Sequence, residues 1–263
     1  MDTEKMKRTL LTPEYDFLRQ NMHLGGNIIL LGPGGSHAYG MAREDSDLDI
    51  RGNAVNTKRE ILLGEDFEQV VESETDTVIY SLRKMVGLLL RCNPNTIEIL
   101  GLEQDKYLSL SETGRELLQM KKAFLSKLCI HSFSGYAHGQ LRRMENKTAR
   151  QIGQAQQEKH ILNKLGKHMA HLLRLYLMCI DILTKEEIIT CRTKEHDLLM
   201  RIRNGDYLDD MFRPSPDFYD ILNEYEKKME DAVRNTSLPE LPDYEAVYAF
   251  LERVNEKIVK ESL

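Results

Sequence analysis

The sequence predicts an α+β protein in which a mixed sheet with helices comes first and a helical bundle follows. Two patterns support this fold class. Over the first 110 of the 263 residues, short apolar runs typical of strands alternate with short helical stretches. From Ser111 onward, apolar residues recur three and four positions apart, which is typical of amphipathic helices. We therefore expect one part over residues 1–110 and a helical domain over residues 111–263.

The first part should begin with a short helix and continue with a strand, a helical turn and a second strand. Thr12 is a suitable N-cap for a helix over residues 14–22, and Pro13 suits its first turn. The Asn-Pro-Asn segment at residues 93–95 predicts a turn before a last strand. The expected elements are strands at residues 27–31, 47–53, 75–81 and 96–100, a helical turn at 37–41 and a helix at 82–91.

The second part should consist of helices that pack as a bundle. Leu165, Met169, Leu172 and Tyr176 show the spacing most clearly, since they fall on one face of a helix. The prolines at 214 and 216 interrupt the pattern and separate the last two helices from the rest. The expected helices cover residues 111–128, 131–149, 157–183, 195–205, 217–234 and 244–260.

Composition and charge exclude several classes of protein. A chain of this length with 41% hydrophobic residues can bury a core, and its net charge of −6 gives no overall attraction to polyanions. Nucleic acid would have to bind a local basic patch. No apolar run approaches the roughly 20 residues that span a bilayer, and the N-terminal stretch has no apolar signal core. We expect a cytoplasmic protein that does not enter a membrane. The four cysteines form no Cys-x-x-Cys pair, which argues against a zinc knuckle or a disulfide framework.

Residues 32–52 contain the pattern that says most about the chemistry. A glycine-rich turn leads into Gly35 and Ser36 directly after a predicted buried strand, so backbone N–H groups can approach a phosphate without obstruction. Asp47 and Asp49 follow, and in an extended segment they project to the same side as Arg51. Two carboxylates on one face form a hard oxygen site that suits Mg²⁺.

Each half of this pattern has a plain alternative. Asp-x-Asp pairs are common in surface loops, and a Gly-Gly-Ser sequence alone is only a turn. The order of the two halves, their close spacing and the apolar residues between the acids favour a site, because a solvated loop has no reason to alternate aspartate with leucine and isoleucine.

The combination of Gly35-Ser36 with Asp47-x-Asp49 resembles the signature of the nucleotidyltransferases of the DNA polymerase beta superfamily. A narrower resemblance covers most of the chain, roughly residues 27–207, and adds the stretches VIYSLRKMVGLLLRCNPNTIEIL, LGKHMAHLLRLY and LLMRIRNGDY. In these stretches the chain resembles the YcgL-like nucleotidyltransferases, or RNA repair pathway polymerase-beta family.

The resemblance implies a polymerase-beta-type nucleotidyltransferase core followed by a helical domain. It implies transfer of a nucleoside monophosphate from a nucleoside triphosphate to an acceptor hydroxyl, with release of pyrophosphate. The implied cofactor is Mg²⁺, or Mn²⁺ in its place, bound by Asp47, Asp49 and a third carboxylate. The family name suggests an RNA end as the acceptor, although a protein side chain or a small hydroxylated molecule also fits. The oligomeric state is not indicated.

Two residues are candidates for the third carboxylate. Asp76 begins the strand-like run DTVIYS, on the strand after the Asp-x-Asp strand, where the superfamily often has its third acid. Glu98 stands between two isoleucines in a predicted strand, so it needs a cation, a donor or water if it is buried. The plain alternatives are a turn or cap acid for Asp76 and a core salt bridge to Arg83 or Lys84 for Glu98.

Cationic groups that could bind phosphate lie in the predicted strand 47–53 and in the predicted helix 157–183. Arg51 shares the face of the two aspartates, where it could orient a carboxylate or contact a phosphate. Lys167, His171 and Arg174 belong to a stripe that, by the resemblance, corresponds to a Lys-His…His…Arg pattern. Contact with phosphate or an RNA backbone explains the stripe, and so does a solvated helix face.

The alternative to an enzyme is a non-catalytic nucleotide-binding sensor or assembly subunit, which would keep the phosphate turn without performing transfer. The presence of both Asp47 and Asp49 with Ser36 argues against it. A protein that only binds a polyanion needs fewer carboxylates near the binding site.

Overall fold

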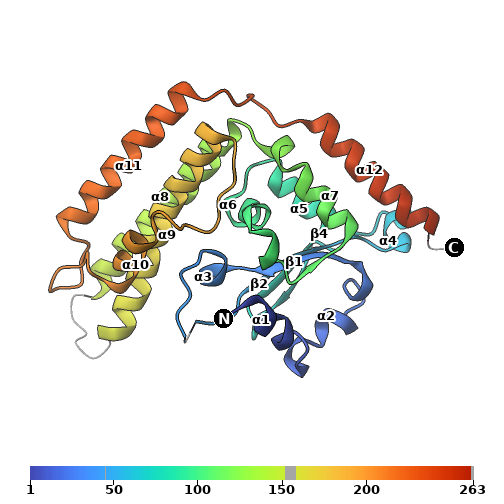
Figure 1. Cartoon of the computed structure of the whole chain (residues 1–263), viewed down its shortest axis with the longest axis horizontal. Helices are drawn as coiled ribbons and strands as arrows, with labels where there is room; N and C mark the ends of the chain where they lie inside the picture. Colours follow the sequence, from blue (N-terminus) through green and yellow to red (C-terminus); the bar gives the residue numbers. More distant parts are fainter. Residues whose placement is uncertain (45, 152–157, 262–263) are drawn as a thin grey trace.

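The computed structural model describes residues 1–44, 46–151 and 158–261. The strands and short helices of the N-terminal part lie together, and a group of longer helices lies beside them (Figure 1). The last helix is separated from this group by a linker and lies against the N-terminal part. The longer helices are α8 (Leu128–Gln151), α9 (Glu158–Lys185), α10 (His196–Asn204), α11 (Pro216–Asn235) and α12 (Tyr244–Glu261).

A mixed sheet forms the centre of the N-terminal part, and its strands follow the spatial order β3-β4-β2-β1-β5 in the described residues. β2 and β4 run parallel, whereas the other neighbouring pairs are antiparallel. This arrangement confirms the predicted α+β class. The strands are β1 (Ile28–Pro33), β2 (Ile50–Ala54), β3 (Gln69–Glu72), β4 (Thr77–Ser81) and β5 (Ser109–Leu110).

The parallel pairing of β2 with β4 aligns the residues that precede the two strands. Ile50 pairs with Thr77 at the first position of each strand. The Ile50 N–H donates to the Asp76 carbonyl oxygen at 3.2 Å, which extends the same register by one step. Asp49 and Asp76 therefore lie next to each other at one edge of the sheet, although they are far apart in the sequence.

The strand predicted over residues 47–53 begins later than expected, at Ile50. Pro33, the last residue of β1, pairs with Ile50, and beyond this pair one further backbone hydrogen bond follows, from the Gly34 N–H to the Asp49 carbonyl oxygen. Asp47 and Asp49 therefore lie in the loop before β2. The strand alternation used to place them on one face does not apply there.

The strand predicted over residues 96–100 is wrong. The segment forms α6 (Pro94–Ile97), followed by a 3₁₀ helix (Glu98–Gly101). Asn93 caps α6 because its side-chain oxygen accepts a backbone hydrogen bond, and a proline follows at the first helical position. The Asn-Pro pair is thus the start of a helix and not a turn into a strand.

Short helices connect the strands, and α4 (Lys58–Leu63) shows a clear local cause. The side chain of Thr57 and that of Glu60 each accept a hydrogen bond from the other residue's backbone N–H, which forms a capping box. The other short helices are α1 (Thr3–Thr9), α2 (Phe17–Gln20), α3 (Gly35–Ala38), α5 (Leu82–Leu89) and 3₁₀ turns at Pro13–Tyr15, Gly25–Asn27 and Gln104–Lys106.

The helices of the second part agree with the predicted ones, with one exception. The helix expected over residues 111–128 is divided into α7 (Glu112–Gln119) and a 3₁₀ helix (Lys121–Phe124). Residue 157, the first residue of the helix predicted over residues 157–183, lies outside the described residues. α9 is central in the group, since it contacts α8, α10 and α11. In the described part of the chain, no helix is both long and apolar enough to cross a bilayer.

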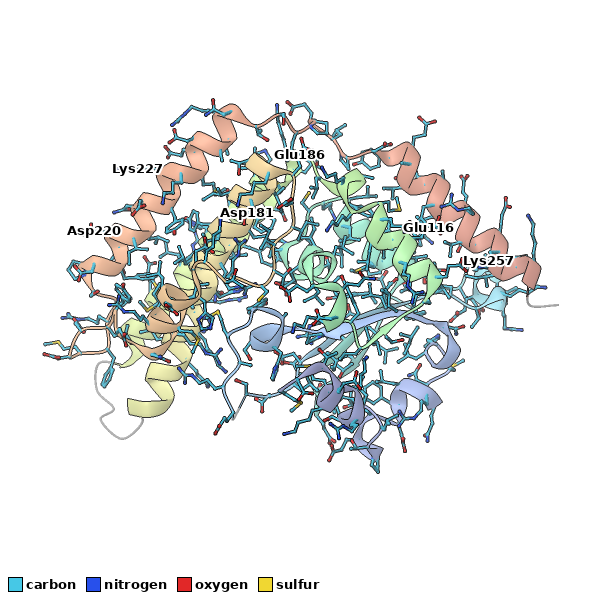
Figure 2. All side chains as sticks on the ribbon, in the orientation of Figure 1. Glu116, Asp181, Glu186, Asp220, Lys227 and Lys257 are labelled. Atoms are coloured by element: carbon cyan, nitrogen blue, oxygen red, sulfur yellow. The ribbon has the colours of Figure 1, made fainter. Side chains whose placement is uncertain are left out.

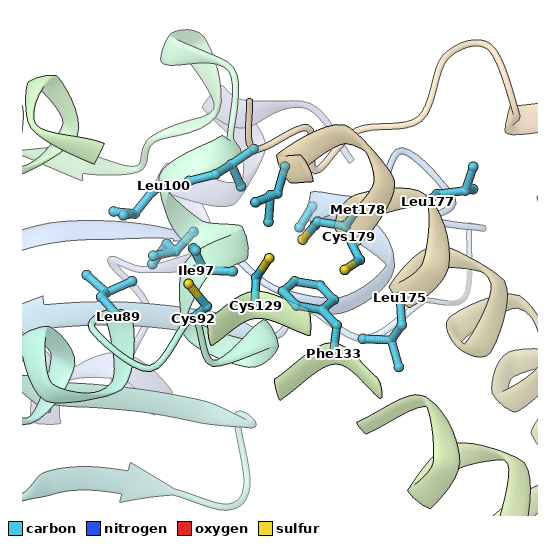
Figure 3. Packing of buried hydrophobic residues seen from close by; sticks show 14 of the residues in the cluster. Leu89, Cys92, Ile97, Leu100, Cys129, Phe133, Leu175, Leu177, Met178 and Cys179 are labelled. Atoms are coloured by element: carbon cyan, nitrogen blue, oxygen red, sulfur yellow. The ribbon is translucent and has the colours of Figure 1, made fainter. Parts of the chain in front are cut away.

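One continuous cluster of buried apolar side chains joins the two parts of the chain. Cys92 after α5, Cys129 and Phe133 on α8, and Cys179 on α9 all belong to it (Figure 3). The three thiols are buried and form no disulfide. Because the cluster crosses residue 110, buried contacts connect both sides of the expected domain boundary, and its position stays a prediction.

α12 contributes apolar side chains to the core next to the N-terminal part. Phe250 on this helix is buried in the same cluster. At the surface, Arg253 forms an ion pair with Glu116 of α7, and Lys257 forms another with Glu112. Figure 2 labels Glu116 and Lys257 on the two helices. The C-terminal helix is therefore attached by apolar packing and by surface ion pairs.

Candidate functional site

The glycine-rich turn between β1 and α3 packs directly against an aspartate. Gly35 has a φ of +51°, a left-handed conformation that favours glycine. A Cβ atom at this position would overlap the carboxylate of Asp49. The Gly34 N–H donates to the carbonyl oxygen of Asp49 at 2.8 Å, so the turn also holds the backbone of that residue. The turn thus fixes the position of Asp49.

Asp49 and Asp76 form a pair of carboxyl groups at the edge of the sheet. When one of the two carboxyl groups is protonated, it donates a hydrogen bond to the other. Burial, followed by the hydrogen bond and the negative charge of Asp76, raises the pKa of Asp49 from 3.8 to about 6, against the opposing charge of Arg51. Asp49 therefore keeps its proton to a higher pH than an ordinary aspartate.

Arg51 binds one member of this pair. Its guanidinium donates to the Asp76 carboxylate at 3.0 Å and to the carbonyl oxygen of Ile50 at 2.9 Å. These contacts correspond to one of the two roles considered for Arg51, the orientation of a carboxylate. Its contact with a phosphate stays a prediction.

A cavity of about 530 Å³ lies beside the acid pair, and a smaller one of about 120 Å³ adjoins it. Ser36, Asp49 and Lys167 line both cavities. The exposed Asp47 lines the smaller one, together with Arg43. The larger cavity is also lined by Gly35, Tyr39, Asp76, Gln140, His171 and Arg174.

Most of the predicted site residues therefore line one or both of the cavities. They come from a turn, two loops and α9. Among the predicted residues, Arg51 and Glu98 line neither cavity in the described structure. Tyr39 and Gln140 were not predicted. Tyr39 follows the phosphate turn directly and could have been considered on that ground, whereas Gln140 is one polar residue among many on α8.

Glu98 forms an ion pair next to the cavity wall. Its carboxylate accepts hydrogen bonds from the Arg174 guanidinium at 3.2 Å and from the Tyr39 hydroxyl at 3.0 Å. The side chain of Arg174, only 4% exposed, also lies over the ring of Tyr39. Burial raises the pKa of Glu98, and the charge of Arg174 opposes this shift. The salt bridge considered for Glu98 thus exists, but its partner is Arg174 and not Arg83 or Lys84.

Arg174 also determines the protonation of His171. An N–H of its guanidinium donates to Nδ1 of His171 at 3.3 Å, and since arginine has no acceptor, Nδ1 carries no proton. Burial, followed by the charge of Arg174, lowers the pKa of His171 to about 3. His171 is therefore neutral at physiological pH. Lys167 is an exposed cation of the predicted stripe that lines both cavities.

The acid pair has the chemistry of a site for a divalent cation. Two adjacent carboxylates provide hard oxygen ligands, and a cation between them would offset the repulsion that adds to the effect of burial on the pKa of Asp49. Within the described residues, no three histidine, cysteine, aspartate or glutamate side chains form a metal-binding cluster. Asp49 and Asp76 thus fit Mg²⁺ or Mn²⁺ as a pair, whereas the exposed Asp47 would have to turn toward them to contribute.

A comparison with protein-family models matches residues 12–209 to the RNA repair pathway DNA polymerase beta family. The matched region contains the sheet, the glycine-rich turn, both acids of the pair and the cavity wall on α9. Comparisons with curated proteins and with solved structures found no match. The family match does not address the YcgL-like label. Because it covers well over half of the chain, this protein belongs to the RNA repair pathway DNA polymerase beta family.

Proposed function

We propose that the protein is a metal-dependent nucleotidyltransferase that transfers a nucleoside monophosphate from a nucleoside triphosphate to an acceptor hydroxyl. The observation that carries this proposal is the Asp49–Asp76 pair, which lies between the Gly35-Ser36 turn and a cavity large enough for a nucleotide. Membership of a polymerase beta family supports the reaction type.

The acids and the turn have distinct roles in the proposed reaction. Asp49 and Asp76 would hold the cation, with Asp76 as the third carboxylate of the predicted set, and Asp47 would complete the set from the loop before β2. When bound, Mg²⁺ or Mn²⁺ neutralises phosphate charge and activates the attacking oxygen. The Ser36 hydroxyl donates a hydrogen bond to a phosphate oxygen, and Lys167 on α9 adds a positive charge to the cavity lining.

The transfer is a single displacement at the α-phosphorus. The acceptor oxygen forms a bond to this phosphorus, the bond to the bridging oxygen of the β-phosphate breaks, and pyrophosphate leaves. The proton of the acceptor hydroxyl passes to a carboxylate of the pair or to water. Catalysis consists mainly of positioning and charge neutralisation, which rigid groups around a cavity can supply.

An RNA end is the proposed acceptor. The support is the RNA repair pathway in the description of the family. A second support is that Lys167 is exposed at the cavity, where it could contact a phosphate backbone.

The test is pyrophosphate release from each of the four ribonucleoside triphosphates, with Mg²⁺ and total cellular RNA. We expect Asp49→Asn and Asp76→Asn to lower the rate by about 100-fold or more, because each removes a charge that faces the developing transition state. Asp220→Asn is the matched control, since Asp220 is exposed on α11 (Figure 2) and lines neither cavity. Tight nucleotide binding without turnover would instead indicate a sensor.

A further inference from the structure

The cavity has two regions of different chemistry. Around the acid pair, Ser36, Asp49 and Lys167 line both the larger and the smaller cavity, so charged groups dominate there. Tyr39, Ala170 and His171 line the larger cavity only. The charged Asp76 and Arg174 also line only this cavity, but Asp76 is paired with Arg51 and Arg174 with Glu98. A phosphate chain suits the first region. The second region offers an aromatic ring, an apolar side chain and a neutral imidazole, which are groups that bind a planar and uncharged part of a ligand.

The geometry around His171 leaves one possible donor. Nδ1 accepts from Arg174, so the ring proton of the neutral imidazole must be on Nε2. The described residues provide no hydrogen-bond partner for this N–H. Arg174 cannot turn away easily, because Glu98 and the ring of Tyr39 hold it. The tautomer of His171 is therefore fixed by a buried network.

A fixed neutral donor is poorly suited to a phosphate. Phosphate oxygens are bound most strongly by cationic groups or by several N–H groups together, and His171 offers one uncharged N–H. An additional proton on the ring would lie next to the guanidinium of Arg174, which the burial of both groups makes costly. A carbonyl oxygen or a ring nitrogen of a nucleobase needs no charge on its donor.

We propose that His171 is a specificity-determining residue that donates its Nε2–H to an acceptor atom of the nucleobase, so that the region around Tyr39 and His171 is the nucleoside subsite. This inference rests on the proposed function, because it assumes that the phosphates of the same nucleotide lie at Ser36, Lys167 and the acid pair. It replaces the phosphate contact that the sequence predicted for His171.

The test compares the binding of nucleotides with the binding of their phosphate chain alone. Dissociation constants are measured with Mg²⁺ and without any acceptor, for ATP, GTP, CTP, UTP and inorganic tripolyphosphate. We expect His171→Phe to raise the dissociation constant about fivefold for those nucleotides whose base has a suitably placed acceptor, because one neutral hydrogen bond is lost. The dissociation constant of tripolyphosphate should not change. Lys167→Ala should weaken nucleotides and tripolyphosphate alike.

Two further variants distinguish the loss of the hydrogen-bond donor from a loss of stability. His171→Gln keeps a neutral acceptor for Arg174 and a neutral donor for the base, so it should restore most of the nucleotide affinity. His131→Phe makes the same change at an exposed histidine on α8, and it should change neither constant. If His171→Phe lowers the melting temperature, His171→Gln still decides the question.

Three results would overturn the inference. Equal weakening of tripolyphosphate and nucleotides by His171→Phe would make His171 a phosphate ligand, and unchanged constants would place it outside the nucleotide site. Wild-type protein that binds tripolyphosphate but gains nothing from a nucleoside would have no nucleoside subsite here. The proposed function fails separately, through pyrophosphate release that does not depend on Asp49.

Discussion

Asp49 is the residue on which the turn, the sheet and the second carboxylate converge. The carbonyl oxygen of Asp49 accepts from Gly34, its carboxyl group lies against Gly35, and its side chain is hydrogen-bonded to Asp76. A carboxylate held in this way cannot move away from its neighbour. The raised pKa of Asp49 thus follows from its burial and from the nearby Asp76.

The pH dependence of stability should report this pair. Because the pKa of Asp49 rises from 3.8 to about 6 on folding, the folded protein binds more protons than the unfolded chain between these values. Its contribution to stability is therefore present at pH 4 and is lost as the pH rises through 6. We expect Asp49→Asn to reduce this loss in urea unfolding without divalent cations. Parallel pH profiles of wild type and variant would contradict this.

Gly35 permits a second expectation about a single residue, with Gly64 as a matched control. Both have positive φ, but an added Cβ at Gly64 meets no atom within 4 Å, whereas at Gly35 it overlaps Asp49. Alanine at Gly64 should cost about 1–2 kcal/mol of stability because of the left-handed backbone, and alanine at Gly35 should cost more, because its Cβ also overlaps Asp49. Only Gly35→Ala should also lower pyrophosphate release, by about 100-fold, since it displaces the carboxylate of Asp49, which we propose as a ligand of the cation. Equal activities of the two variants would show that the turn does not position Asp49.

The elements were predictable where the signal is local and periodic. The long amphipathic helices and strands β1 and β4 follow from hydrophobic spacing, and the Gly-Gly-Ser turn follows from composition. The segment around Glu98 was predicted wrongly, because alternating apolar residues suggest a strand as well as a short buried helix. If Asn93 is interpreted as an N-cap and Pro94 as the first helical residue, the sequence predicts a helix in this segment.

The site was predictable only in part for a related reason. Asp47, Asp49 and Ser36 share one short stretch, so their proximity could be inferred from the sequence. The adjacency of Asp49 and Asp76 depends on parallel pairing of β2 with β4, and sequence periodicity does not reveal which strands pair. The ion pair between the buried Arg174 and Glu98 could not be predicted from the sequence either, because it joins α9 to the segment after α6.

α12 should depend on its apolar face and not on its ion pairs. Phe250 is fully buried, whereas Lys257 is half exposed and forms a surface ion pair with Glu112. We expect Phe250→Ala to cost about 3–5 kcal/mol in urea unfolding, because it leaves a cavity in the core. Lys257→Ala should cost less than about 1 kcal/mol. Similar losses for both variants would mean that the surface pairs hold the helix.

Helix α9 joins the helical group to the N-terminal part of the molecule. This helix carries Lys167, His171 and Arg174 to the cavity, and through Glu98 and Tyr39 it is bound to the segments that follow α6 and α3. The helical group and the sheet therefore meet at the site itself. A change in this contact would alter the cavity and the fold together.

Removal of Glu98 should reveal this connection. Glu98→Ala leaves the buried guanidinium of Arg174 without its carboxylate, which should cost about 3–5 kcal/mol in urea unfolding. Glu240→Ala is the control, because Glu240 forms an exposed ion pair with Lys127 and its loss should not be measurable. A Glu98→Ala protein of wild-type stability but without activity would instead make Glu98 a catalytic acid.

The most direct test of the acid pair as a cation site is the anomalous difference map of a crystal grown with Mn²⁺ and a non-hydrolysable nucleoside triphosphate. We expect a peak within bonding distance, about 2.1 Å for a magnesium-like ion, of carboxylate oxygens from both Asp49 and Asp76, with the phosphates over Ser36. A nucleotide bound in the cavity without such a peak, with Asp49 and Asp76 still hydrogen-bonded to each other, would contradict it.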